Sequence, residues 1–595
     1  MTYRAPVRDL AFSREAVARI DDLAATVAFP DYDRDVMAAV LEAAGQVAET
    51  LLAPLNRVGD QQGARYADGA VTAAPGFAEA YRDFAAGGWT GLAASPAHGG
   101  QGLPKALELA AFEPVHSANM AFGLCPMLSL AAIEALEAHG DGRQKHLYLT
   151  RLISGEWTGA MCLTEPQAGS DLGALTTQAV PKGDGTYSLT GQKIYITWGD
   201  HDATDNILHL VLARLPDAPP GPKGISLFLA PKVMVNDQGV PGARNAFRPV
   251  GIEHKLGIHA SPTCVMAYEG ATAELIGRPN EGLAHMFTMM NAARVAVGVE
   301  GVAIAERAYQ QALAYALDRR QGRSPWTGET GAPIFDHPDV RRTLSVMKAR
   351  IEAGRGICLS AGVAADLARH SATEDEKRFW KGREDLLTPI AKAWSTDMGV
   401  EVASLGVQVH GGMGFIEETG AAQHYRDARI APIYEGTNGI QAMDLVGRKL
   451  GQDGGEAARA VIADMTVSLG ELKHVFEGKP VERFATAVEA VRDATLWLLD
   501  RKSDPVAADD VLAGADAYLK LMGDVIGGWM LARGAIEAAR RLKAGEGDPA
   551  WLEGKLALFE IYAANVLGHA SSRLAAIGQG GGLLRRMTRE ALGAT

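Results

Sequence analysis

The sequence predicts a mainly helical α+β protein in which one β-domain lies between helical domains. Up to about residue 157, Ala and Leu are dense and apolar residues recur three and four apart, a spacing that is typical of amphipathic helices. From Thr158 to about Gly277, β-branched runs alternate with turn residues, and helical periodicity returns from about Leu283 to Leu450. Because no helical pattern separates the expected strands, we expect an antiparallel, barrel-like β-domain and not a Rossmann unit.

These changes in composition and in the spacing of apolar residues predict four domains. They are an N-terminal helical domain (1–157), a middle β-domain (158–278), a C-terminal four-helix bundle (279–450) and an additional helical domain (451–595). In the additional domain we expect helices at about 456–476, 482–501, 507–543 and 551–577, followed by a flexible glycine-rich tail at 578–582. The charged stretch 366–388 is interpreted as a solvated helical hairpin or an insertion.

Composition excludes several classes of protein. The 595 residues carry 58 Lys and Arg against 71 Asp and Glu, a net charge of −13, which argues against a nucleic-acid binder. The four cysteines lie far apart and form no C-x-x-C pair, so we expect neither disulfides nor a metal site. The first residues do not resemble a signal peptide, and the longest apolar run, about 120–133, is too short to span a bilayer. We therefore expect a cytoplasmic protein.

Three segments carry residues suited to chemistry. The loop 161–171 (MCLTEPQAGSD) offers backbone N–H groups and hydroxyls that suit polar ring edges or phosphates, although it could also be an ordinary capped turn. In the expected strand 187–198, alternation places Ile194, Ile196 and Trp198 on one face and Lys193, Tyr195 and Thr197 on the other. An aromatic ring and a hydroxyl on one face could cover a planar heterocycle, or simply pack the sheet.

The third segment joins 408–415 (QVHGGMGF), 425–429 (YRDAR) and 433–441 (IYEGTNGIQ). Its glycines permit close approach of a ligand to the backbone. Glu435 stands between an aromatic residue and a glycine, and a carboxylate beside apolar groups can have the raised pKa that a general base needs. A lone glutamate at a helix end in contact with water is the simpler alternative.

Taken together and in this order, the three segments resemble the acyl-CoA dehydrogenase family of flavoproteins, over about residues 36–450. The T-E-P-x-A-G-S-D loop and the Y-E-G-T segment are highly specific in combination. The N-terminal TYRAPVRDLAF, the YITWGDHD strand end and the long helical C-terminus are similar to a bacterial group of the family that oxidises 3-(methylthio)propanoyl-CoA in dimethylsulfoniopropionate demethylation.

The resemblance implies non-covalent FAD between the β-domain and the C-terminal helices, with part of each site supplied by a neighbouring subunit. The implied flavin-side residues are Met161, Leu163, Thr164, Ser170, Tyr195, Thr197 and Thr437. Arg319, Gln408, Gly411 and Gly412 match positions that reach the pyrophosphate and adenosine of the neighbouring subunit's FAD. Tyr195 replaces the tryptophan that is common in the family, and the family's R-x-x-F-G around Arg319 is shortened and lacks its phenylalanine.

The resemblance also implies the catalytic groups. Glu435 is the expected base that removes the C2 proton of the thioester, while Glu300, on the helix where some family branches carry their base, is the competitor. Arg294 matches a substrate-side arginine, and Ser170, Tyr434 and Gly436 complete the expected substrate site. A helix-surface ion pair is the alternative role for Arg294. The turn 255–262 (KLGIHASP) is interpreted as structural.

The implied reaction is α,β-dehydrogenation of an acyl-CoA, with reduced FAD reoxidised by electron-transfer flavoprotein. Large members of the family with such a C-terminal extension are often dimers, so the resemblance implies a homodimer. The principal alternative is a straight-chain acyl-CoA dehydrogenase of β-oxidation, which differs only in its acyl pocket. A nucleic-acid-binding flavoprotein and an acyl-CoA oxidase are further alternatives.

Overall fold

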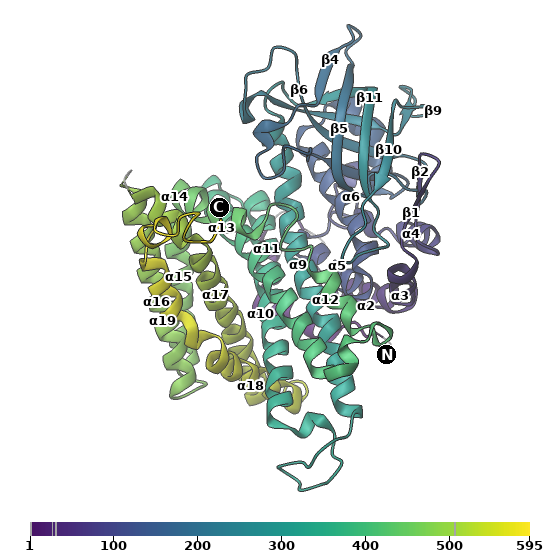
Figure 1. Cartoon of the computed structure of the whole chain (residues 1–595). Helices are drawn as coiled ribbons and strands as arrows, with labels where there is room; N and C mark the ends of the chain where they lie inside the picture. The colour runs from purple at the N-terminus through teal and green to yellow at the C-terminus, as the bar shows by residue number, and fades with distance from the viewer. Residues whose placement is uncertain (1–2, 27, 30–32, 505–506, 595) are drawn as a thin grey trace.

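Three long helices form the centre of the molecule and run side by side (Figure 1). They are α9 (Gly282–Asp318), α10 (Pro338–His370) and α11 (Glu374–His410). The computed structural model describes residues 3–26, 28–29, 33–504 and 507–594. The β-domain lies above one end of these helices, the N-terminal helices lie on one side and the additional C-terminal helices on the other (Figure 1). The mainly helical α+β class is confirmed.

The N-terminal part is helical apart from one short hairpin. Its helices are α1 (Val7–Phe12), α2 (Arg34–Val47), α3 (Ala53–Gln62), α4 (Phe77–Ala86), α5 (Lys105–Ala118), α6 (Met120–His139), α7 (Gly142–Gln144) and α8 (Thr150–Ile153), and its strands are β1 (Arg65–Ala67) and β2 (Ala70–Thr72). By length and composition alone, residues 34–62, α6 and α9 could each cross a membrane, so the expectation that the apolar run at 120–133 is too short to do so is wrong. The apolar windows of α6 and α9 are 89% and 67% buried, so packing inside the protein accounts for their apolar character.

The middle domain holds one seven-stranded sheet in the order β10-β11-β5-β4-β6-β3, with β7 paired to both β11 and β6. Its strands are β3 (Thr158–Cys162), β4 (Gln178–Pro181), β5 (Tyr187–Thr197), β6 (Ile207–Arg214), β7 (Ile225–Pro231), β10 (Phe247–Ile252) and β11 (Thr263–Ile276), and β8 (Val233–Val235) pairs separately with β9 (Pro241–Arg244). Only the single pair Gln178 and Arg214 joins β4 to β6, so the barrel is not strictly closed. Most pairs are antiparallel, as expected, but β3 and β4 lie parallel to β6.

The alternation expected along β5 is wrong at its centre. The register against β11 shifts between the partners of Lys193 and Ile196, which inserts one extra residue in β5. Such a bulge reverses the face of the residues before it. Lys193 is consequently fully buried with Ile196, whereas Tyr195, at φ 58°, is 61% exposed.

The bundle is completed by α12 (Ala421–Ala428), α13 (Asn438–Asp444) and α14 (Leu450–Gln452). The charged stretch 366–388 is the turn between α10 and α11, together with the helix ends that flank it. Thr373 and Glu376 form a reciprocal capping box that starts α11. The helical-hairpin interpretation is therefore confirmed.

The additional domain contains α15 (Glu456–Leu472), α16 (Lys479–Lys502), α17 (Ala508–Ala544), α18 (Pro549–Asn565), α19 (Ala570–Gly578) and α20 (Gly582–Arg585). The single helix expected over 551–577 is broken after Asn565, where Val566 adopts φ −117°. The glycine-rich 578–582 is not a free tail, because the Gly581 N–H donates to Asp510 at 2.7 Å.

A buried ion network ties this domain to the rest of the protein. Lys555 of α18 lies 2.8 Å from Asp9 of α1 and 2.7 Å from Glu352 of α10. Lys348 also pairs with Asp9, at 2.6 Å. The additional domain therefore packs on the bundle through charged as well as apolar contacts, and the first helix of the chain is part of the same junction.

Candidate active site

One large cavity, of about 910 Å³, opens between the β-domain and the bundle. A volume at the upper end of the range for ligand pockets suits a large ligand or two ligands together. The sequence-predicted residues that line it are Met161, Leu163, Thr164, Ser170, Tyr195, Thr197, Arg294, Tyr434, Glu435, Gly436 and Thr437. Residues from three distant parts of the chain, which the motifs had linked only by resemblance, therefore share one cavity.

The first loop of the cavity is held by a buried ion pair. The Lys193 ammonium donates to Glu165 at 2.7 Å and to the Leu163 carbonyl at 2.9 Å. Burial alone would raise the pKa of Glu165, but Lys193 and the amides and hydroxyls of Thr176 and Thr177 lower it to about 2. The carboxylate thus stays ionised and fixes the loop that carries Thr164 and Ser170 toward the cavity.

The wall formed by β5 presents Tyr195 and Thr197 to the cavity. The bulge turns the Tyr195 ring outward, so its face is available to a planar ligand. Within the described part of the chain, the hydroxyls of Thr164, Ser170 and Thr197 make no hydrogen bond to protein. Three unengaged hydroxyls around an exposed ring form a polar rim that can bind the edge of a heterocycle.

The opposite wall carries Glu435 in a strained loop. Glu435 adopts φ 53° and Gly436 φ 81°, and a Cβ on Gly436 would lie only 2.7 Å from Gln441 Nε2. Non-glycine residues at positive φ are uncommon and concentrate at functional sites. The Glu435 backbone N–H has no protein partner among the described residues, so it is free to bind a ligand oxygen.

A buried lysine holds this loop from behind. Lys392 of α11 donates to the Gly436 carbonyl at 2.9 Å and to Asn438 Oδ1 at 2.9 Å. Asn438 in turn donates to Asp397 at 2.8 Å. Burial lowers the pKa of Lys392 to about 7, against the opposing charge of Glu435. Lys392 was not predicted from the sequence, although a single lysine inside the otherwise apolar run TPIAKAW is a signal for a buried ionic role.

Burial raises the pKa of Glu435, while the positive charges of Arg294 and Lys392 oppose the shift. Arg294 is 4% exposed and lies 3.7 Å from Asp444, and its Nε has no partner among the described atoms. A buried donor without a partner is costly unless a ligand satisfies it. Arg294 is thus mostly inside the protein and faces the cavity, which favours the ligand-binding role over the helix-surface ion pair.

Glu300 does not line the cavity. It is fully buried behind Tyr434, whose hydroxyl donates to Glu300 Oε2. Burial raises the pKa of Glu300 to about 8, with the Glu435 charge acting in the same direction. Glu300 is therefore placed to hold Tyr434 and not to reach a substrate, whereas Glu435 reaches the cavity directly.

Four predicted cofactor residues, Arg319, Gln408, Gly411 and Gly412, lie elsewhere. Arg319 ends α9 and Gln408 lies near the end of α11, and the stacking of Tyr315 on His410 brings these two helix ends together. Arg294 and Arg319 are 25 positions apart on α9, which is about 38 Å at 1.5 Å per residue. Arg294, on the cavity, and the four remaining predicted cofactor residues therefore lie far apart along the direction of this helix.

Family models match almost the whole chain. The models described as the acyl-CoA dehydrogenase N-terminal, middle and C-terminal domains match residues 38–156, 160–271 and 280–450, and an acetyl-CoA dehydrogenase C-terminal-like model matches 462–588.

Whole-length relatives agree with the family models. The chain is 46% identical to 3-methylmercaptopropionyl-CoA dehydrogenase of Ruegeria pomeroyi, covering 96% of this chain and 97% of the relative. It is 32% identical to a butyryl-CoA dehydrogenase of Syntrophomonas wolfei, with 95% of both covered. Its fold is similar to an acyl-CoA dehydrogenase of Bacillus anthracis complexed with FAD, at TM-score 0.72 and 20% identity, covering 96% and 92% of the two chains.

Proposed function

The chain belongs to the acyl-CoA dehydrogenase family of FAD-dependent oxidoreductases acting on CH–CH bonds, and from that membership we propose that it oxidises 3-(methylthio)propanoyl-CoA to 3-(methylthio)acryloyl-CoA. The observation that carries the reaction type is Glu435, a carboxylate of raised pKa in the wall of a 910 Å³ cavity. The whole-length identity of 46% to the Ruegeria enzyme supports the thioether substrate. The butyryl-CoA dehydrogenase relative favours a short straight acyl chain as the second candidate.

The cavity fits FAD together with an acyl thioester. The unengaged hydroxyls of Thr164, Ser170 and Thr197 and the exposed Tyr195 ring offer what an isoalloxazine requires, a set of edge donors and a flat apolar cover. Thr437 accepts the Ile440 N–H as the cap of α13, so its own proton remains available to a ligand. FAD, when bound, supplies the hydride acceptor and the route for electrons to leave the site.

The protein supplies a base and a donor on the two sides of the substrate carbonyl. Loss of the weakly acidic C2 proton of a thioester requires a base and stabilisation of the developing enolate oxygen. The Glu435 carboxylate takes the C2 proton, and the free Glu435 backbone N–H donates to the carbonyl oxygen. Because Lys392 and Gln441 bind the adjoining carbonyls, the strained loop keeps both groups of Glu435 toward the substrate.

A second copy of the chain completes the site in this proposal. Arg294, which lines the cavity, and Arg319 are about 38 Å apart along α9, which favours contacts with two different copies of FAD. Around Gly411 and Gly412 the apolar side chains of Met413, Phe415 and Ile416 are 50%, 86% and 46% exposed, as expected for a surface that a second subunit covers. We infer a homodimer in which each FAD contacts both subunits.

The same proposal includes electron-transfer flavoprotein as the partner that accepts the electrons.

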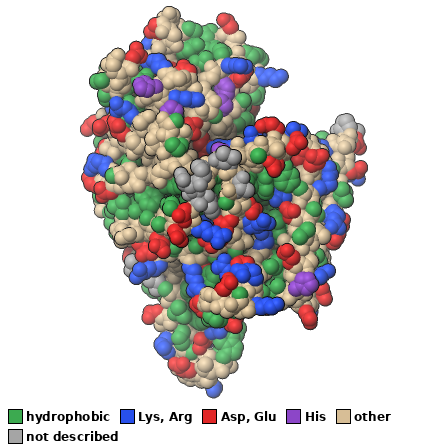
Figure 2. Space-filling model, turned by 180° about the vertical axis from the view of Figure 1, so that it is seen from behind, with side chains coloured by type: hydrophobic (Ala, Val, Ile, Leu, Met, Phe, Trp, Pro, Cys, Tyr) green, Lys and Arg blue, Asp and Glu red, His purple; other side chains and the backbone are tan. Residues whose placement is uncertain are grey.

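It also includes a cytoplasmic location. The four cysteines are all buried and unpaired, as is usual in a reducing compartment. On the face shown in Figure 2, the described Lys and Arg side chains are interspersed with Asp and Glu and form no continuous basic surface. That distribution disfavours the nucleic-acid-binding alternative.

The test is anaerobic bleaching of the bound flavin by 3-(methylthio)propanoyl-CoA, butyryl-CoA and octanoyl-CoA. We expect rapid loss of the oxidised flavin band with the thioether. Faster bleaching by a straight-chain thioester would assign the enzyme to β-oxidation, and bleaching by none of the three would contradict a dehydrogenase. Hydrogen peroxide produced in step with turnover in air would instead indicate an oxidase.

A further inference from the structure

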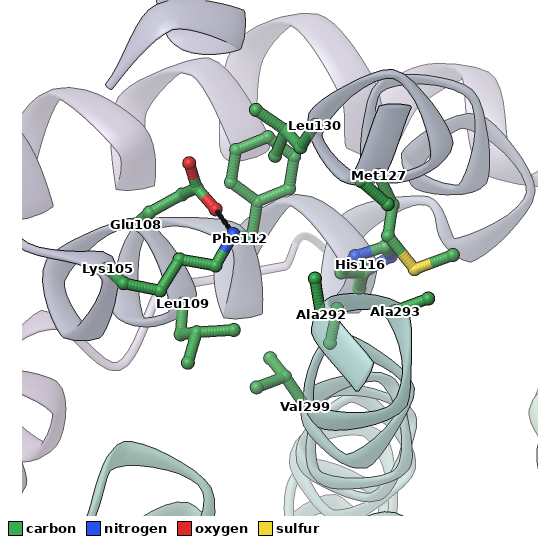
Figure 3. Close-up of a pocket in the computed structure, with 12 residues that line it drawn as sticks. Lys105, Glu108, Leu109, Phe112, His116, Met127, Leu130, Ala292, Ala293 and Val299 are labelled. Atoms are coloured by element: carbon green, nitrogen blue, oxygen red, sulfur yellow. Dashed lines mark hydrogen bonds and ion pairs between the residues drawn. The ribbon is translucent and has the colours of Figure 1, made fainter. Parts of the chain in front are cut away.

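A second, much smaller cavity lies between α5, α6 and α9. Its volume is about 20 Å³. Figure 3 shows Lys105 and Glu108 at one end of it, and His116 and Met127 at the other. Phe112, Leu130 and Val299 line the part between, so the cavity is apolar except at its two ends. At the Lys105 end the ammonium pairs with Glu108 and with Glu134, which closes that side.

The other end holds a buried imidazole without partners. His116 is 1% exposed, and within the described part of the chain neither ring nitrogen has a hydrogen-bond partner. Its position is fixed by close packing, because a Cβ on Gly123 would lie 2.4 Å from His116 Nδ1. Burial lowers the pKa of His116 to about 3, so the ring is neutral and offers one N–H donor and one lone pair. Buried polar groups in proteins are rarely left unsatisfied, and each exception calls for a ligand or a role.

The small cavity adjoins the catalytic one. Met127 lines both cavities, so its side chain forms the partition between them. On the α9 side, Ala293 lines the small cavity and the next residue, Arg294, lines the large one. Methionine side chains are unbranched and adapt readily to a neighbour, so a chain end in the large cavity can displace this partition.

We propose that His116 is a specificity-determining residue, which selects acyl chains carrying a heteroatom near their end by hydrogen-bonding that heteroatom beyond Met127. The inference rests on the proposed acyl-CoA dehydrogenase function. A single water needs about 10–15 Å³ measured in the same way, so 20 Å³ holds one or two non-hydrogen atoms. A terminal S–CH3 group has that size, and a thioether sulfur is a weak acceptor for the imidazole N–H.

Two isosteric thioesters isolate the heteroatom. 3-(Methylthio)propanoyl-CoA and pentanoyl-CoA have the same chain length and differ by sulfur in place of CH2, and 3-methoxypropanoyl-CoA replaces the sulfur by a stronger acceptor. The measurement is the rate constant of anaerobic flavin reduction divided by the apparent dissociation constant for each thioester. For the wild-type holoenzyme we expect this quotient to be about 5-fold higher for the thioether and the ether than for pentanoyl-CoA. A factor of about 5 corresponds to the usual free energy of one hydrogen bond.

In His116→Leu we expect the ratio of the thioether to pentanoyl-CoA to fall to about 1. In His116→Gln, which keeps a donor, we expect this ratio to be restored in part. Ala296→Leu fills the cavity and keeps the chain end away from the imidazole, so it should also lower the thioether-to-pentanoyl ratio toward 1. An unchanged thioether-to-pentanoyl ratio in His116→Leu overturns the inference. If His116→Leu does not fold, an unchanged thioether-to-pentanoyl ratio in Ala296→Leu overturns it.

The outcome for the proposed function is separate. Wild-type enzyme whose flavin none of these thioesters reduces would contradict the dehydrogenase itself. Wild-type enzyme that oxidises the thioether and pentanoyl-CoA at a ratio independent of residue 116 would leave the dehydrogenase intact and remove only the role of His116.

Discussion

Lys392→Met is the perturbation that best tests how the catalytic loop is held. Lys392 is fully buried, and methionine occupies a similar volume without the charge or the donors. The Gly436 carbonyl would keep only Gln441 Nε2 at 3.3 Å, and Asn438 Oδ1 only Thr396 Oγ1 at 3.4 Å. At roughly 1 kcal/mol for each under-satisfied acceptor, the loop conformation that presents Glu435 loses about 2 kcal/mol, which corresponds to about a 30-fold fall in kcat/KM.

The charge of Lys392 gives a second readout. The positive charge of Lys392 lowers the pKa of the Glu435 carboxyl, so the removal of this charge in Lys392→Met should raise that pKa. Because the base acts when it is ionised, the acid limb of the kcat/KM profile should move to higher pH. The matched control is Lys381→Met on the same helix, where the side chain is 51% exposed and pairs with Glu384. Lys392→Met with full flavin content, near-normal kcat/KM and an unmoved acid limb would refute this reasoning.

Three further results are expected. Glu435→Gln should retain FAD, as its absorbance spectrum will show, but its rate of flavin reduction should fall about 10²–10⁴-fold, the usual contribution of a general base. Glu300→Gln should remain active. Equal losses of rate in the two variants would contradict Glu435 as the base. Lys193→Met should lower the flavin content of the purified protein, because it removes the buried anchor of the first cavity loop, and full flavin occupancy would show that the anchor is dispensable. Lys555→Met should lower the urea midpoint by the equivalent of about 3 kcal/mol, since it leaves two buried carboxylates sharing Lys348, while the exposed Lys543→Met should not.

The order of helical and β-rich regions, and Glu435 as the candidate base, could be predicted from the sequence because both depend on local residue patterns. Periodicity reports the buried face of a helix directly, and the T-E-P-x-A-G-S-D and Y-E-G-T segments are contiguous. The break after Asn565 was not predicted, although Gly568, three residues further on, is a signal for a helix end.

Features that depend on pairing between distant segments could not be predicted from local residue patterns. The bulge in β5 is set by its register against β11, and it reverses the face on which Lys193 lies. Period-two alternation alone cannot show one inserted residue. Lys392 and Glu165 likewise gain their roles only when a helix and a loop far apart in the chain come together around buried charge. The parallel pairing of β3 with β6 also carries no local signal.

The arrangement of α9 links catalysis to assembly in physical terms. The same 37-residue helix presents Arg294 to the cavity of its own chain and ends at Arg319, beside the apolar residues exposed around Gly411. The 25 residues of α9 between Arg294 and Arg319 span about 38 Å and keep these two surfaces apart. If both surfaces bind FAD, each subunit must contribute to two sites, and each site must be shared. Flavin binding would then stabilise the dimer and dimerisation would strengthen flavin binding, because a ligand that contacts both subunits is coupled to their association by mass action.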